Sequence, residues 1–152
     1  MPDLKAFAPQ GMLHEGWVAQ VDDYALDCGW LCKGSYLVVA DVAGGLSAFA
    51  GDSGERIWQK KGLHQDGLLA VAIHPDGDRF ATSGQDGTVL IWDSEQGELI
   101  HLIQPGKAWV EHLAWSADGD HLAVAASKTV HIYNSDGIEQ WRTEEHPSTV
   151  SS

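Results

Sequence analysis

The imidazole and thiol side chains in this sequence that could bind a metal ion are eight histidines and two cysteines. Four of the histidines fall in different predicted strands and turns, without a repeated ligand spacing such as His-Glu-x-x-His: His74, His112, His121 and His131. Three residues separate Cys28 from Cys32, whereas structural zinc sites use closer pairs that recur elsewhere in the chain. We therefore predict no bound metal and no cofactor.

The residue patterns of common enzyme classes are also missing. The sequence contains no Gly-x-Ser-x-Gly elbow, no phosphate-binding Walker loop and no dinucleotide-binding fingerprint. The carboxylate pairs Asp22-Asp23 and Glu144-Glu145 are adjacent in sequence, as is common in solvated turns. We predict that the protein is not an enzyme, and we assign no catalytic residue.

Composition and charge narrow the class of partner. The chain has 152 residues, 43% of them hydrophobic and 20% charged, so it is long and apolar enough to bury the core of one domain. Nine Lys and Arg residues against 22 Asp and Glu residues give a formal net charge of −13. This charge disfavours binding to nucleic acid or to anionic membranes. A protein partner of basic character fits it better.

The first residues and the cysteine content indicate the compartment. The opening segment Met1–Ala8 lacks the charged-then-apolar order of a signal peptide, and no apolar run approaches the roughly 20 residues that span a bilayer. Two cysteines are too few for a disulfide scaffold. We expect a cytoplasmic protein with reduced thiols.

An internal repeat organises the chain. The turn Pro75-Asp76-Gly77 recurs as Ala117-Asp118-Gly119, 42 residues later, and both turns precede an apolar run. Trp92 aligns with Tyr133 at an offset of 41 residues, and Phe49 aligns with Trp92 at an offset of 43. Three copies of a unit of about 42 residues therefore account for most of the chain.

Each copy reads as four short strands. In the middle copy we predict strands at 68–74, 79–83, 88–92 and 98–103, separated by Pro-Asp-Gly, Gln-Asp-Gly and Ser-Glu-Gln-Gly turns. Asp-Gly pairs between apolar runs favour tight hairpins, because glycine tolerates a positive φ. No segment of ten or more residues shows a helical apolar period. The unit is predicted to be a four-stranded antiparallel meander, and the protein all-β.

The alignment of the copies also predicts core positions. Cys28 aligns with Val71, and Trp30 aligns with Ile73. We therefore expect Cys28 and Trp30 to be inward-facing core residues of a first strand.

The period, the Pro-Asp-Gly turn and the pattern His64…Asp86-Gly87…Trp92-Asp93 resemble a blade of the WD-repeat β-propeller family. The resemblance implies a partial propeller of four-stranded antiparallel blades. It also implies a buried structural tetrad, formed in the middle copy by His64, Thr82, Asp86 and Trp92. A carboxylate, an imidazole, a hydroxyl and an indole can satisfy one another as a chain of hydrogen bonds. We expect this tetrad to stabilise the fold rather than to catalyse.

The other copies depart from the tetrad pattern, which makes them degenerate blades. The first copy has Val21, Val39, Ala43 and Phe49 at the four places, and the third has lost the turn aspartate in a deletion near Ser127. We predict an N-terminal extension at 1–13, a degenerate blade 1 at 14–63, the best-matching blade 2 at 64–105 and a degenerate blade 3 at 106–145. Residues 146–152 are predicted to form the first strand of a truncated blade 4, because His146 and Val150 match His64 and Leu68.

Three blades and one strand are fewer than the roughly 4–8 blades of a closed propeller. We expect the ring to be completed either by oligomerisation, as in a pair of three-bladed subunits, or by chain beyond this sequence. Open ends would otherwise expose apolar sheet faces.

The resemblance implies a non-catalytic scaffold for protein–protein interaction. We predict that a partner contacts the face that carries the loops before the first strands and the turns between second and third strands. The candidate contact residues are Tyr24, Leu69, Gln85, Trp109 and Glu111. One alternative is a ligand-binding or catalytic propeller with a central-channel site, since the Gly54–Trp58 and Gly137–Trp141 spacings are similar to those of quinoprotein propellers. Another is a half-propeller fragment whose function lies in missing blades.

Overall fold

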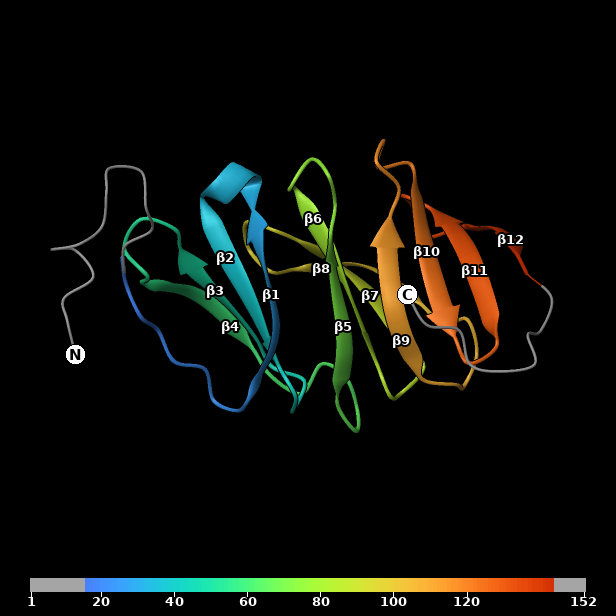
Figure 1. The fold of residues 1–152 in the computed structure, drawn as a ribbon, viewed down its shortest axis with the longest axis horizontal. Coiled ribbons are helices and arrows are strands. Elements are labelled where there is room, and N and C mark those ends of the chain that lie inside the picture. The colour runs from blue at the N-terminus through green and yellow to red at the C-terminus, as the bar shows by residue number, and fades with distance from the viewer. Residues whose placement is uncertain (1–15, 144–152) are drawn as a thin grey trace, which may run out of the picture.

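The computed structural model describes residues 16–143, which form three four-stranded sheets (Figure 1). The first sheet consists of β1 (Ala25–Leu31), β2 (Tyr36–Asp41), β3 (Leu46–Ala50) and β4 (Arg56–Lys60). The second consists of β5 (Leu68–Ile73), β6 (Arg79–Gly84), β7 (Val89–Asp93) and β8 (Leu99–Ile103). The third consists of β9 (Val110–Trp115), β10 (His121–Ala126), β11 (Thr129–Asn134) and β12 (Glu139–Arg142).

Each sheet is an antiparallel meander, in which every strand pairs with the next strand of the chain. The Asp-Gly turns act as expected, with φ values of 74° at Gly77, 78° at Gly87 and 78° at Gly119. Helix within the described residues is limited to a short 3₁₀ turn at Cys32–Gly34. The predicted fold class, an all-β partial propeller, is confirmed.

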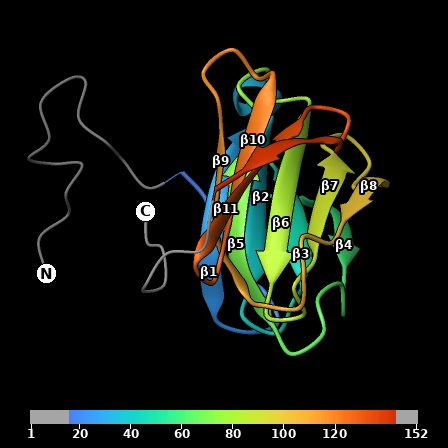
Figure 2. The ribbon, with the colours of Figure 1, turned by 90° about the vertical axis from the view of Figure 1, so that its right-hand side faces the viewer.

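The three sheets stand side by side, with their first strands β1, β5 and β9 next to one another (Figures 1 and 2). Leu31, Val38 and Leu46 of the first sheet pack against Phe80 and Trp92 of the second. A second apolar cluster joins the second sheet to the third and contains Ile91, Ile103, Val110, Leu122 and Tyr133. The hydrophobic core therefore lies between the sheets.

The expectation that Cys28 and Trp30 are core residues is wrong. Both are exposed, and Trp30 keeps 55% of its surface accessible. Their repeat counterparts Val71 and Ile73 pack into the cluster between the first and second sheets. The corresponding face of the first sheet has no sheet against it among residues 16–143 (Figure 1). The physical reason for the error is that burial at this position depends on a preceding sheet.

Two predicted segments, the extension at 1–13 and the strand at 146–152, lie outside the described residues. The limits of the three blades stay predictions, although β1–β4, β5–β8 and β9–β12 fall within them. In residues 16–143 we find no helix whose length and apolar character would let it cross a membrane.

Candidate functional site

The structure brings the four tetrad residues together in the second sheet. His64 lies in the loop before β5, Thr82 on β6, Asp86 in the β6–β7 turn and Trp92 on β7. The His64 Nδ1 atom is 3.2 Å from Asp86 Oδ1, and its Nε2 atom is 2.8 Å from Thr82 Oγ1. The indole Nε1 of Trp92 donates to the same hydroxyl at 2.9 Å. A single chain of hydrogen bonds thus links two strands, the turn between them and the loop before β5.

The Asp86 carboxylate also organises the turn in which it lies. Its Oδ1 atom accepts hydrogen bonds from the Thr88 backbone N–H at 3.0 Å and the Thr88 hydroxyl at 2.8 Å. Its Oδ2 atom accepts from the backbone N–H of Gln65 at 3.1 Å. Sequence reasoning missed Thr88, although a Thr two residues after a turn Asp is a recognisable signal for this contact. Asp86 therefore fixes both the β6–β7 turn and the loop before β5.

Burial decides the charge state of this network. Desolvation lowers the pKa of the His64 imidazole below its usual value of 6.5 and outweighs the opposing effect of Asp86. For Asp86, burial acts to raise the pKa, but the hydrogen bonds from Thr88 and His64 outweigh it, so the pKa lies below 3.8. At neutral pH a neutral imidazole therefore donates to a carboxylate. The Thr82 hydroxyl is fully buried and bonded to both His64 and Trp92, so this arrangement suits a structural network.

In the first sheet, different hydrogen bonds stabilise the corresponding turn between β2 and β3. Asp41, buried at the end of β2, accepts hydrogen bonds from the backbone N–H groups of Ala43 at 3.1 Å and Gly45 at 2.9 Å. The close approach of this carboxylate leaves no room for a Cβ at Gly45. The β2–β3 turn thus keeps a carboxylate, two residues before the aligned position Ala43. The alignment of the repeats did not identify Asp41 as a turn residue, because it compares sequence positions and not the geometry of the turn.

The third sheet replaces the tetrad with apolar packing. Tyr133 occupies the place of Trp92, and only 4% of its surface is exposed. Burial raises the pKa of the Tyr133 phenol to about 12, so the ring stays neutral. It packs in the cluster between the second and third sheets with Val110 and Leu122.

The five candidate contact residues lie at one end of the molecule, where the first strands begin and the second strands finish (Figure 1). Tyr24 and Trp109 precede β1 and β9 and are 82% and 52% exposed. Leu69, Gln85 and Glu111 are half-buried at the same end. The backbone of Gln85 is held by a hydrogen bond from its N–H to the carbonyl of Gly67. Two exposed aromatic rings and three partly covered side chains thus share one end of the sheets.

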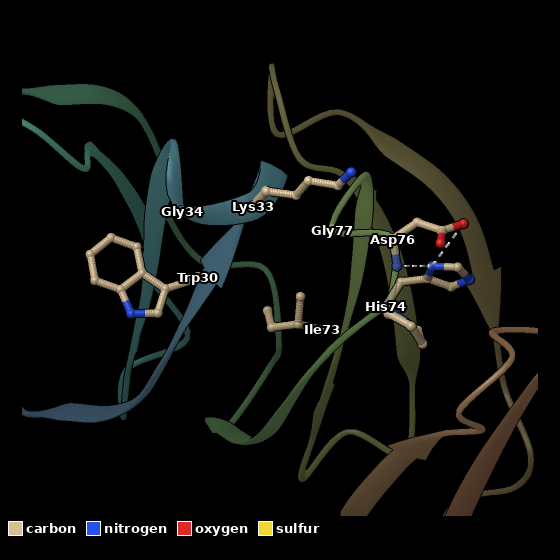
Figure 3. Close-up of a pocket in the computed structure, with 8 residues that line it drawn as sticks. Trp30, Lys33, Gly34, Ile73, His74, Asp76 and Gly77 are labelled. Carbon is tan, nitrogen blue, oxygen red and sulfur yellow. Dashed lines mark hydrogen bonds and ion pairs between the residues drawn. The ribbon is translucent and has the colours of Figure 1, made fainter.

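The opposite end contains a groove of about 670 Å³ between the first and second sheets (Figure 3). It is lined by Trp30, Lys33, Gly34, Ile73 and the turn residues 74–77. His74 is buried beside it, and its Nε2 is 2.9 Å from the carbonyl oxygen of Gly119 in the third sheet. Cys32 makes the equivalent contact one sheet earlier, donating its backbone N–H to the carbonyl of Gly77 at 2.9 Å. These bonds join neighbouring sheets at this end.

His74, Asp76 and Asp78 also have the donor atoms of a metal site, which lie within 4.8 Å of one another. The Nδ1 atom of His74, however, accepts a hydrogen bond from the Asp76 backbone N–H at 3.1 Å. With Nε2 donating to Gly119, both ring nitrogens of His74 are occupied. We therefore assign His74 to the contact between sheets and no metal to this group.

Comparison with known proteins agrees with this architecture. The family model described as "WD domain, G-beta repeat" matches residues 60–93 and 97–134. The solved structure of the RRP9 WD40 repeats superposes with a TM-score of 0.79 at 16% identity, over 88% of this chain and 42% of that one. The chain belongs to the WD-repeat β-propeller family.

Two curated relatives are similar to part of the chain. The rice (Oryza sativa subsp. japonica) small ribosomal subunit protein RACK1y is 34% identical over 71 residues, which are 47% of this chain and 21% of that protein. Mouse (Mus musculus) WD repeat-containing protein 1 is 35% identical over 77 residues, 48% of this chain and 13% of the relative. The matches thus span about a fifth or less of each relative.

Proposed function

We propose that this chain is a non-catalytic module for protein–protein interaction. The rice relative is named as a protein of the small ribosomal subunit, so that member of the family works within an assembly. The tetrad, with its neutral His64, supplies rigidity rather than chemistry. The partner would contact the end of the sheets that carries Tyr24 and Trp109.

The observation that carries this proposal is the exposure of these two aromatic rings, 82% for Tyr24 and 52% for Trp109, on loops held by the sheets. Large aromatic side chains dominate the binding energy of protein interfaces. The Tyr24 backbone is fixed, because its carbonyl accepts a hydrogen bond from Val42 N–H at 3.0 Å. Leu69, Gln85 and Glu111 would form the surrounding contacts.

The test compares proteins captured by the wild-type chain with those captured by Tyr24→Ala and Trp109→Ala. We expect each substitution to weaken capture of a specific partner by about 10-fold or more, while the melting temperature changes little. Trp141→Ala is the matched control, because Trp141 is also exposed, at 55%, but lies on β12. Equal loss with the control variant would contradict the proposed surface, and a large fall in melting temperature would assign the two rings to the core.

We also propose that the open face of the first sheet is covered by another blade, from a second copy or from further chain. That face has an apolar groove of about 330 Å³ lined by Trp17, Cys28, Leu37, Val39 and Phe49, among others. The equivalent face of the second sheet is a packed core. Light scattering over a concentration series tests the first form of this proposal: a dimer independent of concentration supports it, and a monomer contradicts it.

A further inference from the structure

The two ends of the molecule differ strongly in charge. The β5–β6 and β9–β10 turns lie at one end of the molecule (Figure 1). Almost every connection at this end contains carboxylates: Asp76, Asp78, Glu95, Asp118, Asp120 and Asp136. The cations at this end are Lys33, Arg56 and Arg79. The opposite end, with Tyr24 and Trp109, carries more of the basic residues: Lys60, Lys61, Lys107, Lys128 and Arg142. Among residues 16–143, carboxylates therefore exceed cations by more at the end with the β5–β6 turn than at the Tyr24–Trp109 end, where Asp22, Asp23, Asp66 and Asp86 also lie.

The negative field reaches the groove at this acidic end. The pKa of the Cys32 thiol is raised by burial first, and then by the charges of Glu95, Asp93 and Asp78. Cys32 is the residue beside Lys33, which lines the groove. Three carboxylates of the second sheet thus together make the electrostatic potential at Cys32 more negative.

The groove combines this field with apolar surface. Trp30 lies on one side and His74 with Asp76 on the other, with Ile73 between them (Figure 3). The side chain of Asp76 is 76% exposed at the rim, whereas Asp78 lies outside the lining residues and is paired with Arg79, whose Nε is 3.5 Å from its Oδ1. An exposed indole, an aliphatic side chain and the Asp76 carboxylate together fit long side chains with cationic heads.

We propose that this groove docks an arginine- or lysine-rich segment of a protein partner. The aliphatic stem of one arginine would lie along Ile73 with its guanidinium beside Asp76, and the guanidinium of a second arginine of the segment would stack on Trp30. Charge complementarity is the argument for this occupant, because the acidic turns surround the groove. The site goes beyond the proposed Tyr24–Trp109 surface, since it lies at the other end of the sheets and recognises a different chemistry.

Lys33 sets the strength of this docking. It is the cationic side chain among the groove residues, so it opposes a basic ligand. Its backbone has a φ of 57°, a conformation that asparagine adopts more readily than most residues. Lys33→Asn therefore removes the opposing charge without straining the turn, and it should strengthen binding.

The probe is a fluorescein-labelled hexa-arginine peptide, titrated with the full chain by fluorescence anisotropy, with hexa-glutamate for comparison. The double variant Asp76→Asn/Glu95→Gln should weaken hexa-arginine binding by about 5- to 10-fold. The matched variant Asp23→Asn/Asp66→Asn removes the same net charge at the opposite end and should change binding less than about 2-fold. Trp30→Ala should weaken binding by about 3-fold or more, and Lys33→Asn should strengthen it by about 2-fold.

Equal loss in the two double variants would overturn the proposal, because binding would then follow net charge and not the groove. Equal affinity for the two peptides, or no effect of Trp30→Ala, would also overturn it. Tyr24→Ala and Trp109→Ala should leave hexa-arginine binding unchanged, so this proposal and the proposed function can fail separately.

Discussion

The first and second sheets have the same four-stranded topology, yet different interactions hold their turns. In the second sheet, Asp86 in the turn connects through His64 and Thr82 to Trp92. In the first sheet, Asp41 at the end of β2 binds only the backbone of its own turn. The comparison teaches that a carboxylate can organise the second turn without a polar chain across the sheet. The third sheet, whose second turn is Ser127-Lys128, forms the same meander without a carboxylate in that turn.

The two sheets also differ in what covers them. Phe80 of the second sheet is fully buried, stacks on Trp58 of the first sheet at a ring distance of 6.2 Å and lies against Trp92. Its counterpart in the first sheet, Leu37, is half-buried on the open face beside Phe49. The second sheet is therefore the centre of the structure, with a neighbour on each side.

The largest expected effect comes from truncating this central packing. Phe80→Ala should lower the free energy of unfolding by about 3–5 kcal/mol, because it removes a fully buried aromatic ring and leaves a cavity between two sheets. Leu37→Ala at the equivalent place should cost clearly less, since part of that side chain already contacts solvent. Urea unfolding of both variants measures the difference. Similar losses would mean that the open face is covered in solution, which would favour self-association.

A smaller effect is expected within the polar network. Thr82→Val keeps the shape of the side chain but leaves the buried Trp92 Nε1 and His64 Nε2 without their shared hydroxyl. We expect a loss of about 1–3 kcal/mol in the free energy of unfolding. The first sheet supplies the control, because the aligned residue is already a valine, Val39, and Val39→Ala tests packing alone. If Thr82→Val were neutral, the tetrad would not contribute to stability in this chain.

Much of the fold could be predicted from the sequence, because the Asp-Gly turns and the 42-residue period restrict the strands. The strand predicted at 79–83 is Arg79–Gly84, and that at 88–92 is Val89–Asp93. The tetrad could be placed for the same reason. The role of Asp41 in the β2–β3 turn could not be predicted, because this carboxylate is two residues away from the aligned position, Ala43. Trp30 was misplaced because the alignment of repeats contains no information on whether a neighbouring sheet is present.

The smallest expected effect is a pH dependence of the free energy of unfolding. It would show whether the neutral state of His64 is required for full stability. Burial holds the pKa of folded His64 below its unfolded value of 6.5, so the unfolded chain binds a proton first as the pH falls. Stability is then complete above about pH 6.5 and declines toward the folded pKa, below which this contribution no longer changes. Asp86, whose pKa lies below 3.8, adds a further loss at lower pH.

The measurement compares urea unfolding of wild type and His64→Asn at pH 7 and at pH 5.5, because the difference between the two proteins isolates one histidine among eight. Wild type should lose more stability than the variant over this interval. The first copy has Val21 at this place, and none of the residues 16–63 is a histidine, so the packing of the first sheet should not respond in the same range. An equal response of both proteins would show that the pKa of His64 is the same in the folded and unfolded chains, so that the effect of Asp86 cancels that of burial.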